Sequence, residues 1–525
     1  MGSENHNIIK LDVEQEYPDY LRDESRHGGH AHGLCFALTT DDIRTALVSG
    51  HKEVAITTQG ARTGIAGGAV PEGGTILNLS RMARIMGLRY DPHRNEFYLT
   101  VQPGVILANL RVLLKSLAFD TTGWSPDSLA ALERFRLNPH YFFPPDPTET
   151  SASIGGMVAC NASGACTFRY GATRCYVEAL EVLLADGALL SLRRGRDKAD
   201  GRTFAFTTGT GRVIAGSLPD YVMPTVKNAA GYFAQDNMDL LDLFVGSEGT
   251  LGIFTAIELR LIPVPPCRCG VMTFFPSEAS SIRFVEVVRT LPIKDQPVAI
   301  EYFDSHSLDL LRTQKRTNAA FSRLPDLPPE LFDAVYVEYH GDEVSQERVI
   351  EALPLQICAA GGLEQASWMA DSDRELERLK AFRHAVPEAV NLVIDERRHS
   401  EPGVTKLGTD MAVPDARLAD VMAMYGAGLR EAGLEYVVFG HIGNNHLHVN
   451  ILPRSLREYS LGKDLYLQWA RTIIAWGGTV SAEHGVGKFK VALLREMYGA
   501  EGIRQMRAVK RSLDPAGILN PGNLF

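Results

Sequence analysis

Apolar residues come in short runs between turn-forming residues over the first half of the chain. Runs of this length, bounded by glycine, proline and asparagine, are typical of short strands interleaved with helices. One such run, residues 257–262, is followed at once by Pro263, Pro265 and Pro266. Because proline has no amide hydrogen for a sheet ladder, this cluster predicts the end of a strand and a domain boundary near residue 265.

The apolar pattern changes after this boundary. Strand-like alternation, as in residues 335–339, is interleaved with helical periodicity, as in residues 374–390. This pattern predicts an antiparallel sheet covered by helices, and we assign residues 266–454 to a substrate-binding cap domain. Residues 455–525 are predicted to form a C-terminal helical segment, and residues 1–265 form the first domain. The predicted fold class is therefore α+β.

Length and charge narrow the classes of function. The chain has 525 residues, 45% of them hydrophobic and 22% charged, with a formal net charge of -10. A negative balance of this size argues against a nucleic-acid partner. The polar N-terminus lacks a signal-peptide pattern and no apolar run reaches transmembrane length, so the expected location is cytoplasmic, or peripheral to the inner face of the membrane.

The cysteines add a second restriction. There are seven, an odd number, and none forms a C-x-x-C pair. This usage disfavours a disulfide framework, a zinc ribbon and an iron-sulfur cluster. Reduced thiols are expected.

Metal-type ligands gather in one C-terminal stretch, where His441 and His448 flank a turn and Glu483 follows downstream. The runs beside the turn read as two strands, and a tight hairpin centred on residues 444–445 would pair His441 directly with His448. Two neutral imidazoles and a carboxylate would hold a divalent ion with open coordination positions, which is typical of a catalytic site. We expect zinc, with manganese or iron as alternatives, since this ligand set does not separate them.

Two further histidines belong to the same stretch. His446 lies two residues before His448 and would point the same way along a strand, so it is a rival ligand. His484 follows Glu483 directly and is not needed as a ligand. Because the unperturbed pKa of imidazole lies close to neutral pH, His484 is the candidate general base.

Three glycine-rich segments lie in the first domain, at residues 59–69, 155–164 and 245–252. The first follows an apolar run, yet its spacing is not that of a nicotinamide-binding Rossmann turn, and it has no Walker lysine. Small residues let a ligand approach the backbone closely. Three such segments in one domain favour a large flat cofactor between them.

Together these motifs resemble the flavoproteins of the vanillyl-alcohol oxidase type, and within them the D-2-hydroxyacid dehydrogenases. The resemblance covers nearly the whole chain, up to residues 520–522 near its end. It implies an FAD-binding domain with two subdomains, and a C-terminal segment that returns to the FAD site. The FAD contacts that it implies are Gly60, Ala61, Arg62, Thr63, Gly64, Gly67, Gly68, Pro145, Thr150, Gly155, Gly156, Asn161, Ser163, Gly164, Tyr170, Glu248, Gly249, Gly252, Ile253 and Asn520.

The chain departs from the family pattern in two places. Residues 60–63 read Gly-Ala-Arg-Thr where relatives often have Gly-Gly-Gly-Thr, so Arg62 either contacts a phosphate or lies on the surface. Residues 443–446 read Gly-Asn-Asn-His in place of Gly-Asp-Gly-Asn. No histidine stands in the first glycine segment, where some relatives attach flavin covalently, so a non-covalent FAD is expected.

The resemblance also implies a reaction, the oxidation of a D-2-hydroxy acid of the D-lactate, glycolate or D-2-hydroxyglutarate class, with hydride passing to flavin N5. Arg383 is the expected clamp for the substrate carboxylate. Lys406 could add charge for a second carboxylate, and Asn450 either bonds the substrate oxygen or completes its strand.

Partners and rival functions stay open at this point. Electrons would leave to a separate acceptor: an electron-transfer protein, a quinone, a partner subunit or oxygen. A homodimer is an alternative to a monomer. Two other functions share the fold: a flavin-dependent transferase like alkyl-glycerone-phosphate synthase, and a non-catalytic flavin subunit of a complex.

Overall fold

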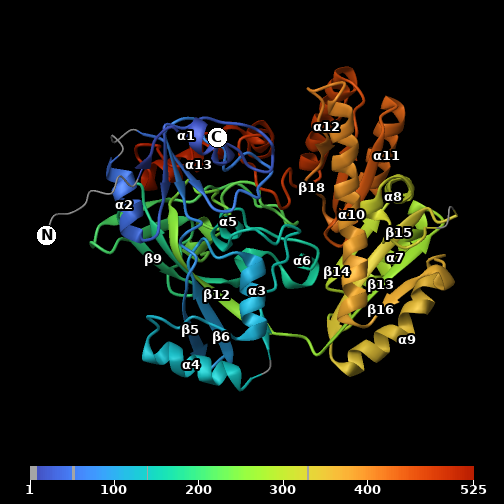
Figure 1. The fold of residues 1–525 in the computed structure, drawn as a ribbon, viewed down its shortest axis with the longest axis horizontal. Coiled ribbons are helices and arrows are strands. Elements are labelled where there is room, and N and C mark those ends of the chain that lie inside the picture. The colour runs from blue at the N-terminus through green and yellow to red at the C-terminus, as the bar shows by residue number, and fades with distance from the viewer. Residues whose placement is uncertain (1–8, 50–53, 139, 328–329) are drawn as a thin grey trace.

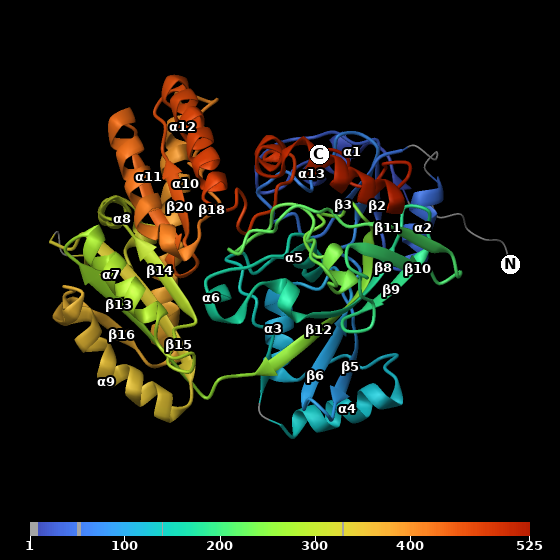
Figure 2. The ribbon, with the colours of Figure 1, turned by 180° about the vertical axis from the view of Figure 1, so that it is seen from behind.

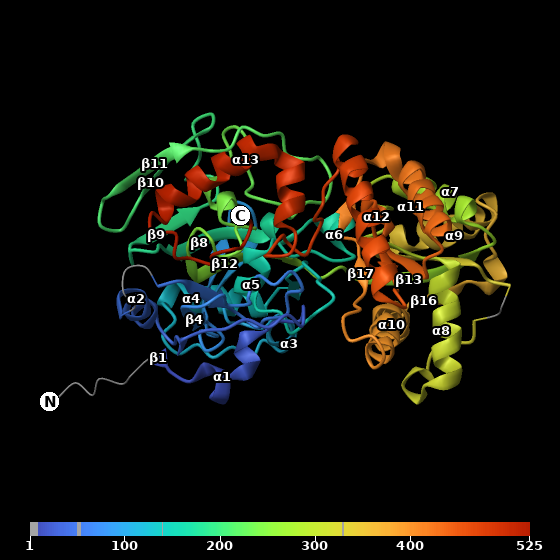
Figure 3. The same cartoon turned by 90° about the horizontal axis from the view of Figure 1, so that it is seen from above.

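The computed structural model describes residues 9–49, 54–138, 140–327 and 330–525, which form two lobes side by side (Figures 1 and 3). The first lobe holds two separate sheets. The smaller sheet contains, in spatial order, β1 (Ile9–Lys10), β2 (Gly33–Phe36), β4 (Thr75–Asn78) and β3 (Ile56–Gln59). Strand β4 runs parallel to both β2 and β3. Strand β3 is last in the order and is therefore an edge strand, and Leu519 pairs with its Ile56.

The larger sheet of the first lobe is antiparallel and is centred on one long strand. In spatial order it contains β5 (Ile85–Asp91), β6 (Glu96–Val101), β12 (Ile253–Pro263), β8 (Val177–Leu183) and β9 (Leu189–Arg193). Strand β7 (Tyr141–Phe142) pairs with the end of β12, and β10 (Thr203–Thr207) and β11 (Val213–Ser217) form a separate hairpin. The first half of the chain adds to this lobe the helices α1 (Val13–Glu16), α2 (Thr40–Ser49), α3 (Leu107–Ser116), α4 (Pro126–Arg136), α5 (Ile154–Ala159) and α6 (Thr167–Tyr170).

The second lobe is built on one antiparallel sheet. In spatial order its strands are β16 (Trp368–Ala370), β13 (Cys267–Phe275), β15 (Asp333–Gly341), β14 (Ala299–Phe303), β19 (Tyr436–His441), β20 (His446–Ile451) and β17 (Leu407–Gly408), with β18 (Met411–Ala412) also on β20. The chain enters this sheet through the short link between β12 and β13, which holds Pro265 and Pro266. The expected antiparallel sheet is confirmed.

Helices cover this sheet, as Figure 2 shows from behind. They are α7 (Glu278–Arg289), α8 (Ser305–Thr317), α9 (Glu343–Ala359), α10 (Asp373–Arg398), α11 (Leu418–Ala432) and α12 (Leu456–Ala475). The expected helix over residues 374–390 lies within α10. Ser372 caps its start by accepting the amide hydrogen of Glu375, and Leu376, Leu379 and Phe382 bury one face at helical spacing.

The C-terminal segment is divided between the two lobes. Helix α12 packs against α11 on the second lobe, whereas α13 (Val491–Leu513) lies on the first lobe against β11 (Figure 3). The return to the first domain therefore begins only after α12. Residues 476–490 cross between the lobes, and they carry Glu483 and His484.

No helix in the described ranges combines the length and the apolar character that crossing a membrane requires.

Candidate active site

The histidine hairpin forms in a different register from the expected one. His441 ends β19 and pairs with His446, the first residue of β20, whereas His448 pairs with Phe439. The connection is a turn of four residues, 442–445, in which Asn445 takes the left-handed conformation with φ 50°. The predicted pairing of His441 with His448 is wrong because that prediction assumed a tight turn centred on residues 444–445.

The new register places three imidazoles on one face of the sheet. Side chains alternate between faces along a strand, so His446 and His448 share a face, and the cross-strand partner His441 joins them. Glu483, from the crossing segment, completes a group in which one ligand atom of each residue lies within 4.8 Å of the others. These are His441, His448 and Glu483, which we predicted as ligands, and the rival His446.

Two of these histidines are held by oxygen acceptors behind them. His441 Nδ1 lies 2.6 Å from Glu301 Oε1, and its Nε2 lies 3.3 Å from the nearer oxygen of Glu483. His448 Nδ1 lies 3.2 Å from the backbone oxygen of Thr409, and its Nε2 lies 3.7 Å from Glu483 Oε1. Metal-binding histidines are typically oriented in this way by an acceptor on the other ring nitrogen. The arrangement fits a divalent ion.

Asp410 is buried and lies behind His446 and His484. Its Oδ1 lies 3.1 Å from His446 Nε2, and its Oδ2 lies 3.4 Å from His484 Nδ1. It also accepts the backbone amide hydrogens of Glu483 and His484, and it pairs with Lys490 Nζ at 2.5 Å. Asp410 therefore orders the crossing segment from the second lobe.

The charges at the site come in compensating pairs. Burial alone would raise the pKa of the Glu483 carboxyl, but Lys227, at 2.5 Å, and His441 hold that pKa well below its usual value. Burial would lower the pKa of His441, but the carboxylate of Glu301 raises it to about 9. Burial lowers the pKa of His446 to about 4. The site thus combines an ionised carboxylate with at least one neutral imidazole at neutral pH.

Sequence reasoning missed Glu301, Asp410 and Lys227. Their partners at the site are 140, 73 and 256 residues away along the chain, respectively. The only usable signal was general, since metal-bound imidazoles usually have carboxylate neighbours. That rule does not say which of the 63 acidic residues is involved.

Arg383 lies close to this site on α10. Its side chain is 11% exposed, and its Nε lies 3.9 Å from Oε2 of Glu301, the carboxylate that holds His441. Asn450 is buried on β20, on the same face as His448. Two of the three predicted substrate residues are therefore neighbours of the ligand group.

Lys406 is placed differently. Its Nζ donates to Oδ1 of Asn391 at 2.8 Å. Asn391 is eight residues after Arg383 on α10, or about 12 Å along the helix axis. Its contact therefore lies about two helical turns from that of Arg383.

The three glycine-rich segments meet around α5. The first follows β3, the second forms α5 and the loop after it, and the third leads into β12 at Ile253. Gly246 and Glu248 donate their amide hydrogens to the carbonyls of Val158 and Ala159. Asn520 accepts from the amide of Thr58 and donates to the carbonyl of Glu248, so it joins β3, directly before the first segment, to the third segment.

Some glycines in these segments are required by the protein's own packing. A Cβ on Gly60 would lie 2.1 Å from Ser153 Oγ, and one on Gly164 would lie 1.9 Å from the backbone oxygen of Asp146. Gly249 has φ 72°. These glycines permit close chain contacts and a left-handed turn.

Other glycines have no such reason. A Cβ on Gly64 would meet no atom of the described residues within 4 Å, and one on Gly68 would make only ordinary contacts. Neither has a positive φ. Neither sterics nor backbone conformation requires glycine at these two positions, and the small residues leave the backbone open to a ligand, so the loop fits FAD.

The remaining predicted FAD residues lie in the same segments. Ala61, Arg62, Thr63 and Gly67 belong to the first loop, Pro145 and Thr150 precede α5, Gly155 and Gly156 are in its first turn, Asn161 and Ser163 follow it, and Gly252 precedes β12. The guanidinium of Arg62 lies over the ring of Tyr20, 4.1 Å from its centre. This stacking occupies the Arg62 side chain.

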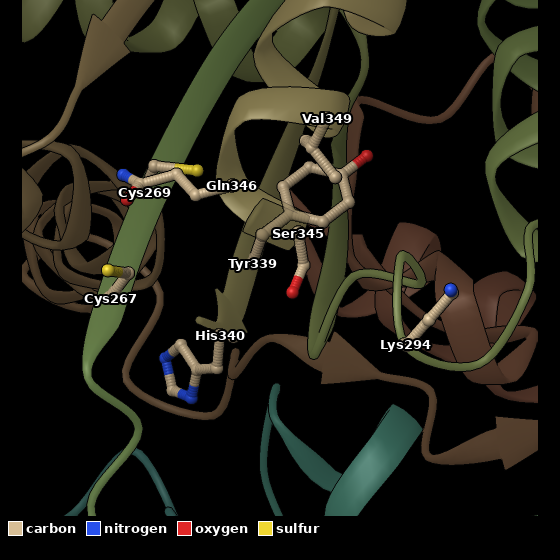
Figure 4. A pocket seen from close by; sticks show the side chains of 9 residues that line it. Cys267, Cys269, Lys294, Tyr339, His340, Ser345, Gln346 and Val349 are labelled. Atoms are coloured by element: carbon tan, nitrogen blue, oxygen red, sulfur yellow. The ribbon is translucent and has the colours of Figure 1, made fainter. Parts of the chain in front are cut away.

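Tyr170 links the lobes. Its hydroxyl shares a hydrogen bond of 2.8 Å with His340 Nδ1, and His340 Nε2 lies 2.9 Å from Glu338 Oε1. His340 also borders a small recess near the start of β13, with Cys267 and Cys269 (Figure 4). Among the described residues that line this recess there is no member of the ligand group. It is therefore separate from the metal site.

Comparison with known proteins places the chain among flavin enzymes. Residues 265–524 match the model of FAD linked oxidases, C-terminal domain, and residues 31–124 and 128–193 match the FAD binding domain. A probable mitochondrial D-lactate dehydrogenase of Danio rerio is 30% identical over 509 residues, covering 96% of this chain and 86% of the relative. A D-lactate dehydrogenase of Anaerostipes hadrus is 28% identical, covering 96% and 92%.

A solved structure of alkyldihydroxyacetonephosphate synthase has the same fold. It superposes with a TM-score of 0.64 over 98% of this chain and 82% of that chain, at 14% identity. At this identity the likeness concerns the fold alone.

Proposed function

Since this chain belongs to the family of FAD-linked oxidases, we propose that it oxidises a D-2-hydroxy acid to the 2-oxo acid with the help of a divalent metal. The D-lactate class is the first candidate, because both relatives described above carry that name. The observation that carries the proposal is the ligand group of three histidines and Glu483, directly beside His484, on the segment that crosses between the lobes.

The metal would be held by His441, His448 and Glu483, with His446 beside them. When bound, the ion supplies a Lewis acid that lowers the pKa of a coordinated hydroxyl, and FAD supplies the acceptor for hydride. The protein supplies the orientation of the substrate, a base for the hydroxyl proton and a counter-charge for the carboxylate.

His484 is suited to take the hydroxyl proton. It is 30% exposed, more than the buried ligand histidines, so a substrate can reach it. The Asp410 carboxylate beside Nδ1 favours the tautomer with its proton on that atom, which leaves Nε2 as the acceptor. Nε2 lies 3.5 Å from Glu483 Oε1, on the side of the ligand group. The proton would therefore be received at Nε2.

Arg383 would bind the substrate carboxylate. Its guanidinium can make two parallel hydrogen bonds to a carboxylate, which fixes the orientation of the acid. It already lies near Glu301, which orients His441. The carboxylate and the hydroxyl of one 2-hydroxy acid would then be bound from neighbouring positions.

The first experiment is anaerobic reduction of the bound flavin, followed by its visible absorbance, with a panel of D- and L-2-hydroxy acids. Fast bleaching by one D-acid is the expected result. Absence of bleaching by every acid, with FAD and metal present, would reject the proposal and favour the transferase or the non-catalytic subunit.

The second experiment tests the base. His484→Ala should slow flavin reduction by on the order of 10²- to 10⁴-fold, the usual contribution of a general base, while FAD stays bound. His306→Ala, at a half-exposed histidine on α8, is the matched control and should leave the rate unchanged. Unchanged turnover in His484→Ala would refute the role of His484.

A further inference from the structure

His446 stands in the ligand group although the family pattern has asparagine at its position. Its side chain is completely buried. Its Nδ1 lies 3.8 Å from Glu483 Oε2, while its Nε2 lies 3.1 Å from Asp410 Oδ1. One ring nitrogen thus faces the shared carboxylate and the other faces an acceptor behind it.

This is the arrangement of the two expected ligands. In His441 the rear acceptor is Glu301, and in His448 it is the backbone oxygen of Thr409. In each of the three histidines, the ring nitrogen that faces Glu483 lies between 3.3 and 3.8 Å from one of its oxygens. Ring centres are 5.4 Å apart for His441 and His446, and 4.5 Å apart for His446 and His448. By position, His446 faces Glu483 as the other two do, although its contact with Asp410 is not a well-aligned hydrogen bond.

The alternative is that His446 is a core histidine satisfied by hydrogen bonds. The structure argues against this, because neither ring nitrogen of His446 makes a well-aligned hydrogen bond with any of the described residues, in spite of the short distance to Asp410. A buried imidazole without such a partner is unfavourable unless something else binds it. A metal ion at Nδ1 would satisfy it.

We infer that His446 is a fourth protein ligand of the ion and that the site takes a six-coordinate metal, such as Mn²⁺ or Fe²⁺; this rests on the proposed function for its substrate. Four protein ligands fill a tetrahedral zinc site, which is the arrangement of closed structural sites. Catalysis needs open positions. A metal that accepts six ligands keeps two, one for the hydroxyl and one for the carboxylate of a 2-hydroxy acid.

The test counts imidazoles at the metal in the FAD-containing protein. The protein is stripped of metal, loaded with Mn²⁺, and examined by X-ray absorption at the manganese edge. The wild type should give three imidazoles, and His446→Asn, which has the family residue, should give two. Affinity for Mn²⁺, measured by titration, should fall in His446→Asn by more than about 100-fold, the upper end of what loss of a mere supporting residue causes.

His484→Asn is the matched control. This histidine also contacts Asp410 and lies near Glu483, but it is outside the ligand group. The control should keep three imidazoles. FAD content and thermal unfolding show whether each variant is folded, and the wild-type count needs no variant at all.

A wild-type count of two imidazoles, or equal counts in the wild type and His446→Asn, would overturn the inference. So would loss of an imidazole in His484→Asn, failure of Mn²⁺ to bind, or four-coordinate zinc in the protein as purified. Flavin bleaching by D-acids is measured separately. A count of three without bleaching leaves the ligand set standing and rejects the proposed reaction, whereas bleaching with a count of two does the reverse.

Discussion

The FAD side and the metal side of the site are built from different kinds of residue. The FAD side consists of turns and small residues, in which Gly60 and Gly64 let chain or ligand come close to the backbone. The metal side consists of buried charged and titratable side chains, in which Glu483, Glu301 and Asp410 each face cations or imidazoles. The first side depends on shape and the second on balanced charge, so the same kind of mutation should have different consequences on each.

The largest effect is expected from Glu483→Gln. This change removes a metal ligand and leaves the Lys227 ammonium, 3% exposed, without its carboxylate. Breaking a buried pair in this way costs about 3–5 kcal/mol of folding free energy. Flavin reduction should fall on the order of 10³-fold, because the metal contributes several kcal/mol to the barrier. Metal content, urea unfolding and flavin reduction measure the three effects.

A double variant controls for the charge. Glu483→Gln combined with Lys227→Met should recover much of the stability, because no unpaired buried charge remains, but it should still lack metal. If Glu483→Gln alone retained stoichiometric metal, the ligand assignment would be wrong.

Asp333 is a buried carboxyl whose partners are neutral, so its pKa is raised, whereas that of the cation-paired Glu483 is lowered. Burial raises the pKa of Asp333 from its ordinary value of 3.8 to about 7, and its partners are the hydroxyls of Tyr302 and Ser281 and the amide of Ser305. The folded protein binds this proton more tightly than the unfolded chain does. Its contribution to stability is therefore present below about pH 4 and is lost as pH rises through about 7.

Asp333→Asn removes this titration while keeping the shape. The variant should be more stable than the wild type by roughly 1–2 kcal/mol at pH 5 and by about 4 kcal/mol at pH 8, since each pKa unit is worth about 1.4 kcal/mol and the loss in the wild type accumulates between pH 4 and 7. Urea unfolding at both pH values measures this. A variant that is less stable than the wild type at pH 8 would contradict the prediction.

Arg383→Lys should affect substrate binding alone. Lysine keeps the charge but loses the two-point contact, which is worth about 1.5–3 kcal/mol, so KM for the D-acid should rise roughly 10- to 100-fold. FAD and metal content should not change. The matched control is Arg378→Lys, at an exposed position of the same helix, and equal KM values in both variants would remove Arg383 from the substrate site.

The smallest effect is expected at Gly64, where a substitution should change FAD binding but not the stability of the apoprotein. Gly64→Ala should weaken FAD binding by about 1–2 kcal/mol, because its methyl group occupies space next to the backbone that the cofactor uses. Apoprotein stability should stay within about 0.5 kcal/mol, since that methyl meets no described residue.

Gly60→Ala is the contrasting variant. It should destabilise the apoprotein as well, because its methyl group would collide with Ser153 Oγ. FAD titration and thermal unfolding of the apoprotein measure both. An unchanged FAD affinity in Gly64→Ala would show that the loop does not touch the cofactor.

Sequence alone was informative wherever the signal was local. Apolar alternation predicted the antiparallel cap sheet, and helical periodicity predicted α10. The histidine hairpin was also predicted, but its register was wrong. The register of a hairpin depends on its turn. The sequence of residues 442–445 did not predict a turn of four residues with Asn445 in the left-handed conformation.

What sequence could not provide were the contacts between distant segments. Glu301 and Lys227 act on His441 and Glu483 from other elements, and Asp410 acts from the loop between β17 and β18. Periodicity reports which face of an element is buried, but not which residue of another element faces it. Burial and charge pairing at the metal side became visible only in three dimensions.

The pairing of the chain end with β3 sets an order of events during synthesis. Ile56 donates its amide hydrogen to Ile518 and accepts one from Asn520, so the edge of the first sheet is completed by residues that are made much later. About half of the chain, residues 265–524, leaves the ribosome between the end of the first lobe and this closure. At roughly 5–20 residues per second the delay is tens of seconds. Throughout that time the nascent first lobe lacks this sheet contact, and the edge of β3 stays exposed.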